Sequence, residues 1–266
     1  MTLAGAAPSA PSSLYRFQNV DLSLGGKLIL NDIAIEVRKG EILCIVGASG
    51  CGKTTLLRLA GGLFKPSRGA VLFDDAPMTA PRQDVAIVFQ DYGRALLPWR
   101  TATGNISLAL EAAKVPAGER PRRIEACLGK VGLAGHADKY PTQMSGGMQQ
   151  RLQIARCLAQ EPQALLMDEP FGALDAMTRQ SLQDEVLALH AETGATIVFV
   201  THDLEEAIYL GDRVVGLLPH PGRVGIEVPI HLPRPRNQLA TREEPEFLRL
   251  RRVLFDFIET SEGHRA

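Results

Sequence analysis

A glycine-rich motif between a strand-like and a helix-like segment constrains the fold of this chain most strongly. Residues 47–54 read GASGCGKT and match G-x-x-x-x-G-K-[ST] at every fixed position. The preceding residues 42–46 read ILCIV, which is typical of a buried strand, whereas residues 54–63 carry leucines at helical spacing. The sequence therefore predicts a strand, a tight turn and a helix in succession, rather than an ordinary glycine turn that happens to precede a helix.

This turn is suited to binding a polyphosphate, because glycines let successive backbone N–H groups point inward and the helix N-terminus adds positive charge. We expect Lys53 to contact the β and γ phosphates, the Thr54 hydroxyl to bind Mg²⁺, and Thr55 to contact the α-phosphate side. Because Cys51 lies within the motif, alkylation of its thiol is expected to block nucleotide binding. The predicted phosphate-binding residues are Gly47, Ala48, Ser49, Gly50, Cys51, Gly52, Lys53, Thr54 and Thr55.

Other apolar runs predict further strands of an α/β fold with a parallel sheet covered by helices on both faces. The candidate buried strands are residues 42–46, 85–89, 164–167, 196–200 and 213–218. An alternating stretch around Gly25 and Gly26, residues 14–37, predicts a β-hairpin near the N-terminus.

Strand signals disappear between about residues 91 and 160, which predicts a helical subdomain inserted into the α/β core. The expected helices there are residues 104–113, 121–131 and 148–160. After a short β stretch from Gly225, a Pro/Arg-rich link (residues 233–237) leads to a helix expected over residues 245–259. The chain is therefore predicted to form one domain over residues 14–260, with tails at 1–13 and 261–266.

Two acidic residues, Asp168 and Glu169, follow the apolar run 164–167. Open α/β sheets bind ligands at the carboxyl ends of their strands, so we expect Asp168 to hold Mg²⁺ and Glu169 to polarise an attacking water. Taken alone, the pair is also compatible with two solvated acids at a strand end.

The composition of the chain limits the partners that it is expected to bind and the compartment in which it is expected to work. Lysine and arginine total 29 against 30 acidic residues, so the net charge of −1 supplies no overall field for nucleic acid or anionic membrane. The apolar runs are far shorter than a membrane span requires, and the chain is not expected to cross a membrane by itself. Four widely separated cysteines favour neither a zinc site nor a disulfide framework, which suggests a reducing cytoplasm.

A second glycine motif lies at residues 144–148, MSGGM, directly before a helical run. Ser145, Gly146 and Gly147 at a helix N-terminus predict a second anion site in the same chain. A lone S-G-G is more often an ordinary N-cap, so its position in an ordered set of motifs decides the interpretation.

That ordered set resembles the nucleotide-binding subunits of ABC transporters over residues 14–260. The matching elements are the Walker A loop 47–54, Gln90 in the Q-loop, the signature 144–148, Asp168 of Walker B, Glu169, the D-loop residues 173–175 and His202 in the H-loop. The resemblance implies a P-loop ATPase fold with a mostly parallel central sheet, an N-terminal antiparallel β subdomain and the inserted helical subdomain.

The resemblance also implies roles for individual residues. Glu169, His202, Gln90 and Lys53 would be catalytic, with Gln90 joining Thr54 and Asp168 at Mg²⁺. His202 would contact the γ phosphate and orient Glu169. ATP would lie between two copies of the chain, so that Ser145, Gly146 and Gly147 touch the γ phosphate bound by the other copy.

The chain departs from the family pattern at two points. Met148 replaces the glutamine usually found at the fifth signature position. The aromatic residue that usually stacks on adenine aligns with Leu24, leaving Tyr15, Phe17 or looser apolar contact as alternatives.

Further features resemble the nitrate, sulfonate and taurine branch of importers. They are LLPW at residues 96–99, SGGMQQR at 145–151 and the Pro/Arg-rich link. The branch implies a permease partner that contacts the chain near Trp99, although Trp99 is equally compatible with a place in the core of the helical subdomain. It also implies an extracytoplasmic substrate-binding protein and a peripheral position on the cytoplasmic face of the inner membrane. The alternatives are a soluble ABC-type ATPase that acts without a permease, and a small-molecule kinase.

Overall fold

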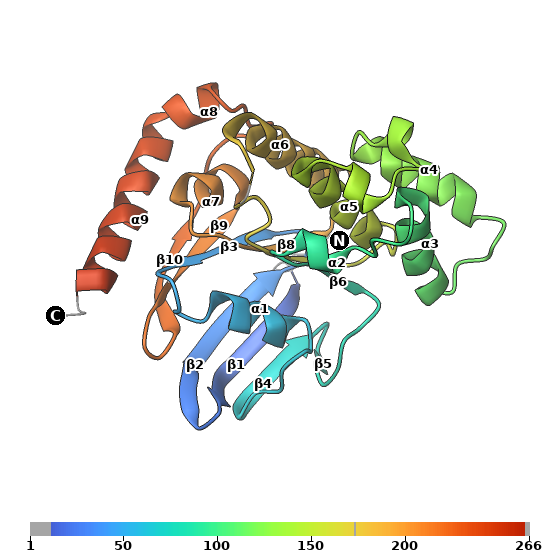
Figure 1. The fold of residues 1–266 in the computed structure, drawn as a ribbon. Coiled ribbons are helices and arrows are strands. Elements are labelled where there is room, and N and C mark those ends of the chain that lie inside the picture. Colours follow the sequence, from blue (N-terminus) through green and yellow to red (C-terminus); the bar gives the residue numbers. More distant parts are fainter. Residues whose placement is uncertain (1–11, 173, 264–266) are drawn as a thin grey trace, which may run out of the picture.

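The structure, a computed structural model, describes residues 12–172 and 174–263. Ala173 of the expected D-loop lies outside the described residues, as does most of the expected N-terminal tail. The described chain forms two β-sheets, with one helix between them and the other helices on the far side of the larger sheet (Figure 1).

The smaller sheet is antiparallel and has the strand order β2-β1-β4-β5. Its strands are β1 (Ser13–Leu24), β2 (Lys27–Arg38), β4 (Arg68–Phe73) and β5 (Ala76–Pro77). Gly25 and Gly26 form the β1–β2 turn with φ angles of +57° and +79°, a region that favours glycine. The expected N-terminal hairpin and antiparallel subdomain are thus present.

The larger sheet has the order β10-β9-β3-β8-β7-β6 and is parallel except for β10. Its strands are β3 (Ile42–Gly47), β6 (Val85–Val88), β7 (Ala164–Asp168), β8 (Thr196–Val200), β9 (Arg213–Leu218) and β10 (Arg223–Pro229). The runs predicted as buried strands all lie in this sheet.

Alternate side chains of each central strand enter two different apolar cores. In β3, Leu43 and Ile45 pack with helix α1 (Lys53–Ala60) and the smaller sheet, whereas Ile42 and Cys44 pack with the helices of the other face. Burial on both faces explains why these strands are continuous apolar runs without polar alternation. The four cysteines are all free and buried.

The helical subdomain is inserted in the chain between β6 and β7, and it lies at one end of the molecule (Figure 1). It contains α2 (Tyr92–Ala95), α3 (Ala102–Ala112), α4 (Arg120–Lys130) and α5 (Gly146–Leu158), with short 3₁₀ turns at Ala134–His136 and Pro141–Gln143. Helix α3 begins two residues before the expected start, because the Thr101 side chain caps it by accepting from the Gly104 N–H.

The remaining helices are α6 (Ala176–Thr193), α7 (Leu204–Leu210), α8 (Ala240–Glu243) and α9 (Pro245–Gly263). Helix α9 continues past the expected end at Glu259, so the expected tail is helical as far as it is described. Packing agrees with the extension, because Ser261 in the added part of the helix is still buried.

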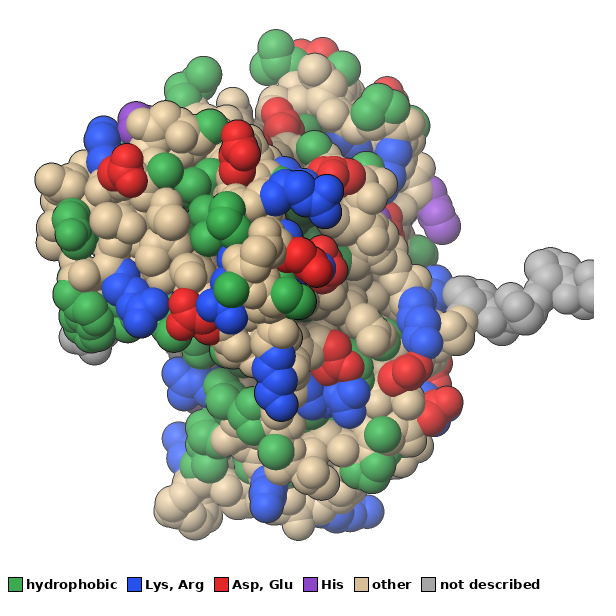
Figure 2. All heavy atoms as spheres, turned by 90° about the vertical axis from the view of Figure 1, so that its right-hand side faces the viewer, with side chains coloured by type: hydrophobic (Ala, Val, Ile, Leu, Met, Phe, Trp, Pro, Cys, Tyr) green, Lys and Arg blue, Asp and Glu red, His purple; other side chains and the backbone are tan. Residues whose placement is uncertain are grey.

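The side of the molecule shown in Figure 2 carries basic and acidic side chains next to one another rather than a patch of one sign. None of the helices within the described ranges is long and apolar enough to cross a bilayer.

Candidate active site

The predicted site segments converge at one edge of the larger sheet, because parallel strands end together. Asp168 of β7 pairs with Val200 of β8, and Ile45 of β3 pairs with the same residue. A cavity of about 440 Å³ lies at this edge. Its lining residues are Ile29, Ser49, Gly50, Gly52, Lys53, Thr54, Thr55, Gln90, Glu169 and His202. All except Ile29 were predicted from the sequence.

The glycine-rich turn adopts a conformation that side chains would obstruct. Gly52 has φ +101°, and a Cβ there would lie 2.6 Å from the Leu30 side chain. Gly52 is also the N-cap of α1 and has no side chain to occupy the first N–H groups of the helix. Without a side-chain cap, N–H groups at this end of the helix suit the binding of an anion.

Lys53 places a positive charge inside this turn. Its side chain is buried, and its Nζ donates hydrogen bonds to the carbonyl oxygens of Gly47 (2.8 Å) and Ala48 (3.3 Å). A buried ammonium needs such partners. The turn thus places a fixed cation beside the uncapped start of α1.

Thr54 lines the cavity, whereas Asp168 is not one of its lining residues and lies behind Thr54. The Thr54 hydroxyl donates to Asp168 Oδ1 at 2.9 Å, and only 5% of Asp168 is exposed. Burial raises the pKa of the Asp168 carboxyl, and the hydrogen bond from Thr54 opposes this rise.

These oxygen donors fit Mg²⁺, which prefers oxygen ligands and combines one or two carboxylates with water and substrate phosphates. Within residues 12–172 and 174–263 no cluster of three or more histidine, cysteine or acidic side chains could hold a metal on its own.

The Glu169 carboxylate lies between two other predicted residues. Its Oε2 is 3.0 Å from His202 Nδ1, and Gln90 Nε2 donates to the same oxygen at 3.5 Å. The Glu169 N–H donates to Val200 O at 2.9 Å, which fixes the backbone beside β8 despite a φ of +43°. A carboxylate held in this way can accept a proton from a water in the cavity.

The structure does not bring every predicted side chain to the cavity. Ala48 and Cys51 are buried beneath the turn, and Cys51 is 1% exposed, so only their backbone can face a phosphate. Burial raises the pKa of the Cys51 thiol, and the nearby Lys53 ammonium opposes part of the rise.

The second glycine motif also lies outside this cavity. Ser145 caps α5, with its Oγ accepting from the Met148 N–H at 3.3 Å. Gly146 and Gly147 form the first turn of α5, and neither lines the cavity. One copy of the chain therefore does not unite its two glycine motifs.

Sequence reasoning did not identify Ile29, which contributes an apolar wall from β2. Leu24 and Leu28 lie on the same hairpin and are 39% and 40% exposed. Tyr15 and Phe17 are buried in the core of the smaller sheet, so neither ring offers a face to adenine.

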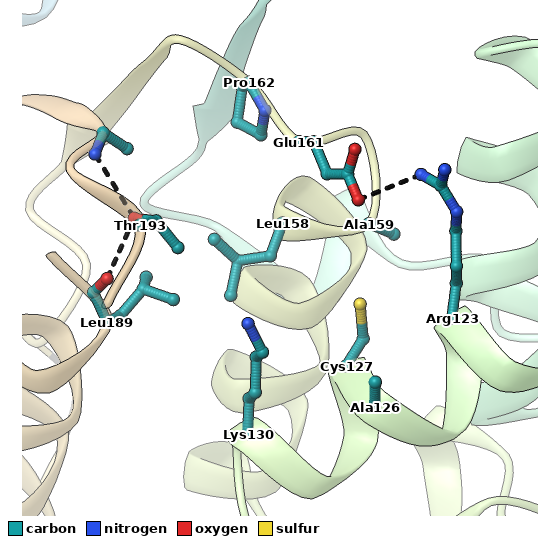
Figure 3. A pocket seen from close by; sticks show the side chains of 11 residues that line it. Arg123, Ala126, Cys127, Lys130, Leu158, Ala159, Glu161, Pro162, Leu189 and Thr193 are labelled. Carbon is teal, nitrogen blue, oxygen red and sulfur yellow. Dashed lines mark hydrogen bonds and ion pairs between the residues drawn. The ribbon is translucent and has the colours of Figure 1, made fainter.

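A second cavity, of about 290 Å³, lies between α4, the end of α5 and the end of α6 (Figure 3). Its walls are mainly apolar and include Leu158 and Leu189, while the Arg123–Glu161 ion pair of 3.0 Å lies at its rim. None of the predicted site residues lines this cavity.

Comparison with known proteins agrees with the geometry of the first cavity. The family model described as "ABC transporter" matches residues 30–172, which include the Walker A turn, Gln90, the signature and the Asp168–Glu169 pair. The chain belongs to the ABC transporter family.

Two relatives of this ABC chain come from Synechococcus elongatus. The nitrate import ATP-binding protein NrtC is 45% identical over 246 residues, which cover 91% of this chain but only 37% of NrtC. The chain thus spans about a third of the length of that relative. The nitrate import ATP-binding protein NrtD is 41% identical over 243 residues, covering 90% of this chain and 88% of NrtD.

The chain is also similar in fold to a solved structure. The dimeric ATP-binding cassette MJ0796 bound to ADP and Pi has a TM-score of 0.71 and 33% identity, covering 82% of this chain and 99% of that chain. The ABC chain described here has the same fold and is an ATPase that binds and hydrolyses ATP.

Proposed function

We propose that the chain is the ATP-hydrolysing subunit of an importer for a small anion such as nitrate, a sulfonate or taurine. The observation that carries this proposal is the 41% to 45% identity with two nitrate import ATP-binding proteins over about nine tenths of the chain. We further propose that residues 14–260 act as one nucleotide-binding domain.

The residues of the cavity divide the chemistry among them. Lys53 and the N–H groups of the glycine turn neutralise the phosphate oxygens. Glu169 takes a proton from the attacking water, and His202 orients the Glu169 carboxylate. Thr54, Asp168 and Gln90 would hold Mg²⁺. When bound, this ion supplies positive charge to the β and γ phosphate oxygens.

We propose that the working unit contains a second copy of the chain. Ser145, Gly146 and Gly147 lie outside the cavity, so they are available to close on a nucleotide bound by the other copy. The likeness to a dimeric cassette supports this arrangement. ATP would hold the head-to-tail dimer together, and hydrolysis would release it.

Trp99 supports a permease as the next partner. Its side chain is 71% exposed, which rules out the alternative of a subdomain core residue. An exposed tryptophan after the Q-loop suits a buried contact with another protein. The remaining proposed parts are an extracytoplasmic substrate-binding protein and a peripheral position on the cytoplasmic face of the inner membrane.

The competing function is a soluble ABC-type ATPase without a permease, and membrane pull-down separates the two. Tagged chain is solubilised with its native membranes in detergent, and bound proteins are identified by mass spectrometry. We expect a multi-span permease with the wild type and much less with Trp99→Ala. The control is Phe255→Ala, which removes an exposed aromatic ring from α9. Soluble partners alone, with ATPase activity intact, would contradict the importer proposal.

A further inference from the structure

Strand β6 forms one edge of the larger sheet, with β7 on one side only. Backbone groups on such a free edge need other partners. Helix α5 supplies them with side chains: the Cys157 thiol lies 3.5 Å from Ile87 O. Helix α5 begins within the signature residues 144–148 and is called the signature helix below. It covers the edge of the strand that leads to Gln90.

Gln153, also on α5, makes the closest of these contacts. The side chain is fully buried, and with its amide oriented to satisfy both partners it bonds to both backbone groups of Phe89. Its nitrogen donates to Phe89 O at 3.2 Å, and its oxygen accepts from Phe89 N at 2.8 Å. Such a double exchange is what a neighbouring strand would make with an edge residue.

The helix also holds the chain beyond Gln90. Arg156 Nη1 donates to Ala95 O at 2.7 Å. Helix α5 thus contacts the backbone before and after residues 90–94, while its own N-terminus carries Ser145. Gln90, in turn, donates to the Glu169 carboxylate.

We propose that Gln153 is a positioning residue, which holds the Gln90 end of β6 against the signature helix and so places the Gln90 amide beside Glu169. Gln153 does not line the nucleotide cavity. Its effect on hydrolysis passes through the backbone of Phe89, the residue immediately before Gln90. This role goes beyond the importer proposal and holds whether or not a permease is bound.

Gln153→Met tests the role, since methionine has a similar length and fills the buried space without either hydrogen bond. Hydrogen exchange of the Phe89 amide is expected to become about tenfold faster, because its acceptor is removed. The kcat for ATP should fall about tenfold, whereas KM should change less than about twofold, because the turn at residues 47–55 is untouched.

Gln150→Met is the matched control. Gln150 is another fully buried glutamine of α5, and its amide has no hydrogen-bond partner within the described part of the chain. Its replacement should leave exchange at Phe89 at the wild-type rate. If Gln153→Met does not fold, Gln153→Asn gives the same two readings, because its shorter side chain does not reach both Phe89 atoms.

Two results would overturn the inference. Unchanged exchange at Phe89 would show that Gln153 does not hold this backbone. Faster exchange with unchanged kcat would show that the contact does not position Gln90. Both results leave the importer proposal standing, since the membrane pull-down tests that separately.

Discussion

Glu169 is the residue that we propose as the base for ATP hydrolysis. It lies 3.0 Å from His202, and its backbone is held beside β8 in an uncommon conformation. Backbone strain of this kind persists only where surrounding contacts impose it. The contacts to His202 and Gln90 then leave the carboxylate aimed at the cavity rather than at solvent.

Glu169→Gln separates binding from hydrolysis. The amide keeps the shape and a hydrogen bond to His202 but does not accept a proton, so turnover should fall about 10²- to 10⁴-fold with ATP binding retained. Lys53→Ala should instead weaken binding, because it removes the cation of the phosphate site. ATP affinity and steady-state turnover measured together distinguish the two. Glu192→Gln, at an exposed ion pair with Lys130, is the control. Wild-type turnover in Glu169→Gln would remove Glu169 from the role of base.

Cys51 gives a prediction with a defined pH dependence. A raised thiol pKa means that the reactive thiolate forms only at higher pH than in an ordinary cysteine. The sequence predicted that alkylation of Cys51 would block nucleotide binding, and the burial of this side chain makes the alkylation itself slow. The alkylation rate should keep rising above pH of about 8.5, where an unperturbed cysteine begins to level off. Mass spectrometry of iodoacetamide labelling checks this, with the urea-unfolded chain as reference. A folded chain that levels off with the reference would contradict it.

Among the elements, those with a local pattern were predictable from sequence and those with distant partners were not. The buried strands were predictable from apolar runs in the sequence, because both faces of these strands are covered by other parts of the chain. For the link at residues 233–237, the sequence showed that it is rich in proline and arginine but did not predict its contacts. In the structure Arg236 donates to the carbonyls of Ile208, Tyr209 and Gly211 at the end of α7, which ties the link to that helix. Nothing local in the sequence pairs an arginine with carbonyls so far away.

The candidate site shows the same division. The Walker A turn and Glu169 were predictable because each follows a strand of one parallel sheet, and such strands end at a common edge. Gln90 and His202 also follow strands of that sheet, but their roles were inferred from the resemblance to ABC transporter subunits. Ile29 was not predictable, since it enters from the other sheet. Gln153 was also missed, because a glutamine inside a helix gives no sign that its partner is the backbone of an edge strand.

At the scale of the whole molecule, the two anion-binding motifs face different surroundings in one chain. The Walker A turn lines the cavity, whereas Ser145 begins α5 outside it. If these motifs are the two halves of one site, as we propose, a second molecule is required to complete either site. This requirement is what makes the dimer proposal testable without knowledge of the substrate.

Mixing wild-type chain with Ser145→Arg tests the shared site. The arginine adds bulk and charge at the face that closes on the other copy. If both sites of a dimer must be complete, an equal mixture should retain about a quarter of the wild-type activity rather than half. The measurement is ATPase rate against the fraction of variant at constant total protein, with Ser145→Ala as the milder control. Activity strictly proportional to the wild-type fraction would contradict a dimer in which both sites must be complete.

The burial of the four cysteines has a practical consequence for studying motion. Burial raises the pKa of the thiols of Cys44, Cys51, Cys127 and Cys157, so native labelling at neutral pH should be slow at each of them. A single cysteine introduced at an exposed position such as Met177 therefore provides a selective anchor for a spin or fluorescent probe in an otherwise natural chain. Distances between two such probes would follow the approach and separation of the two copies during turnover.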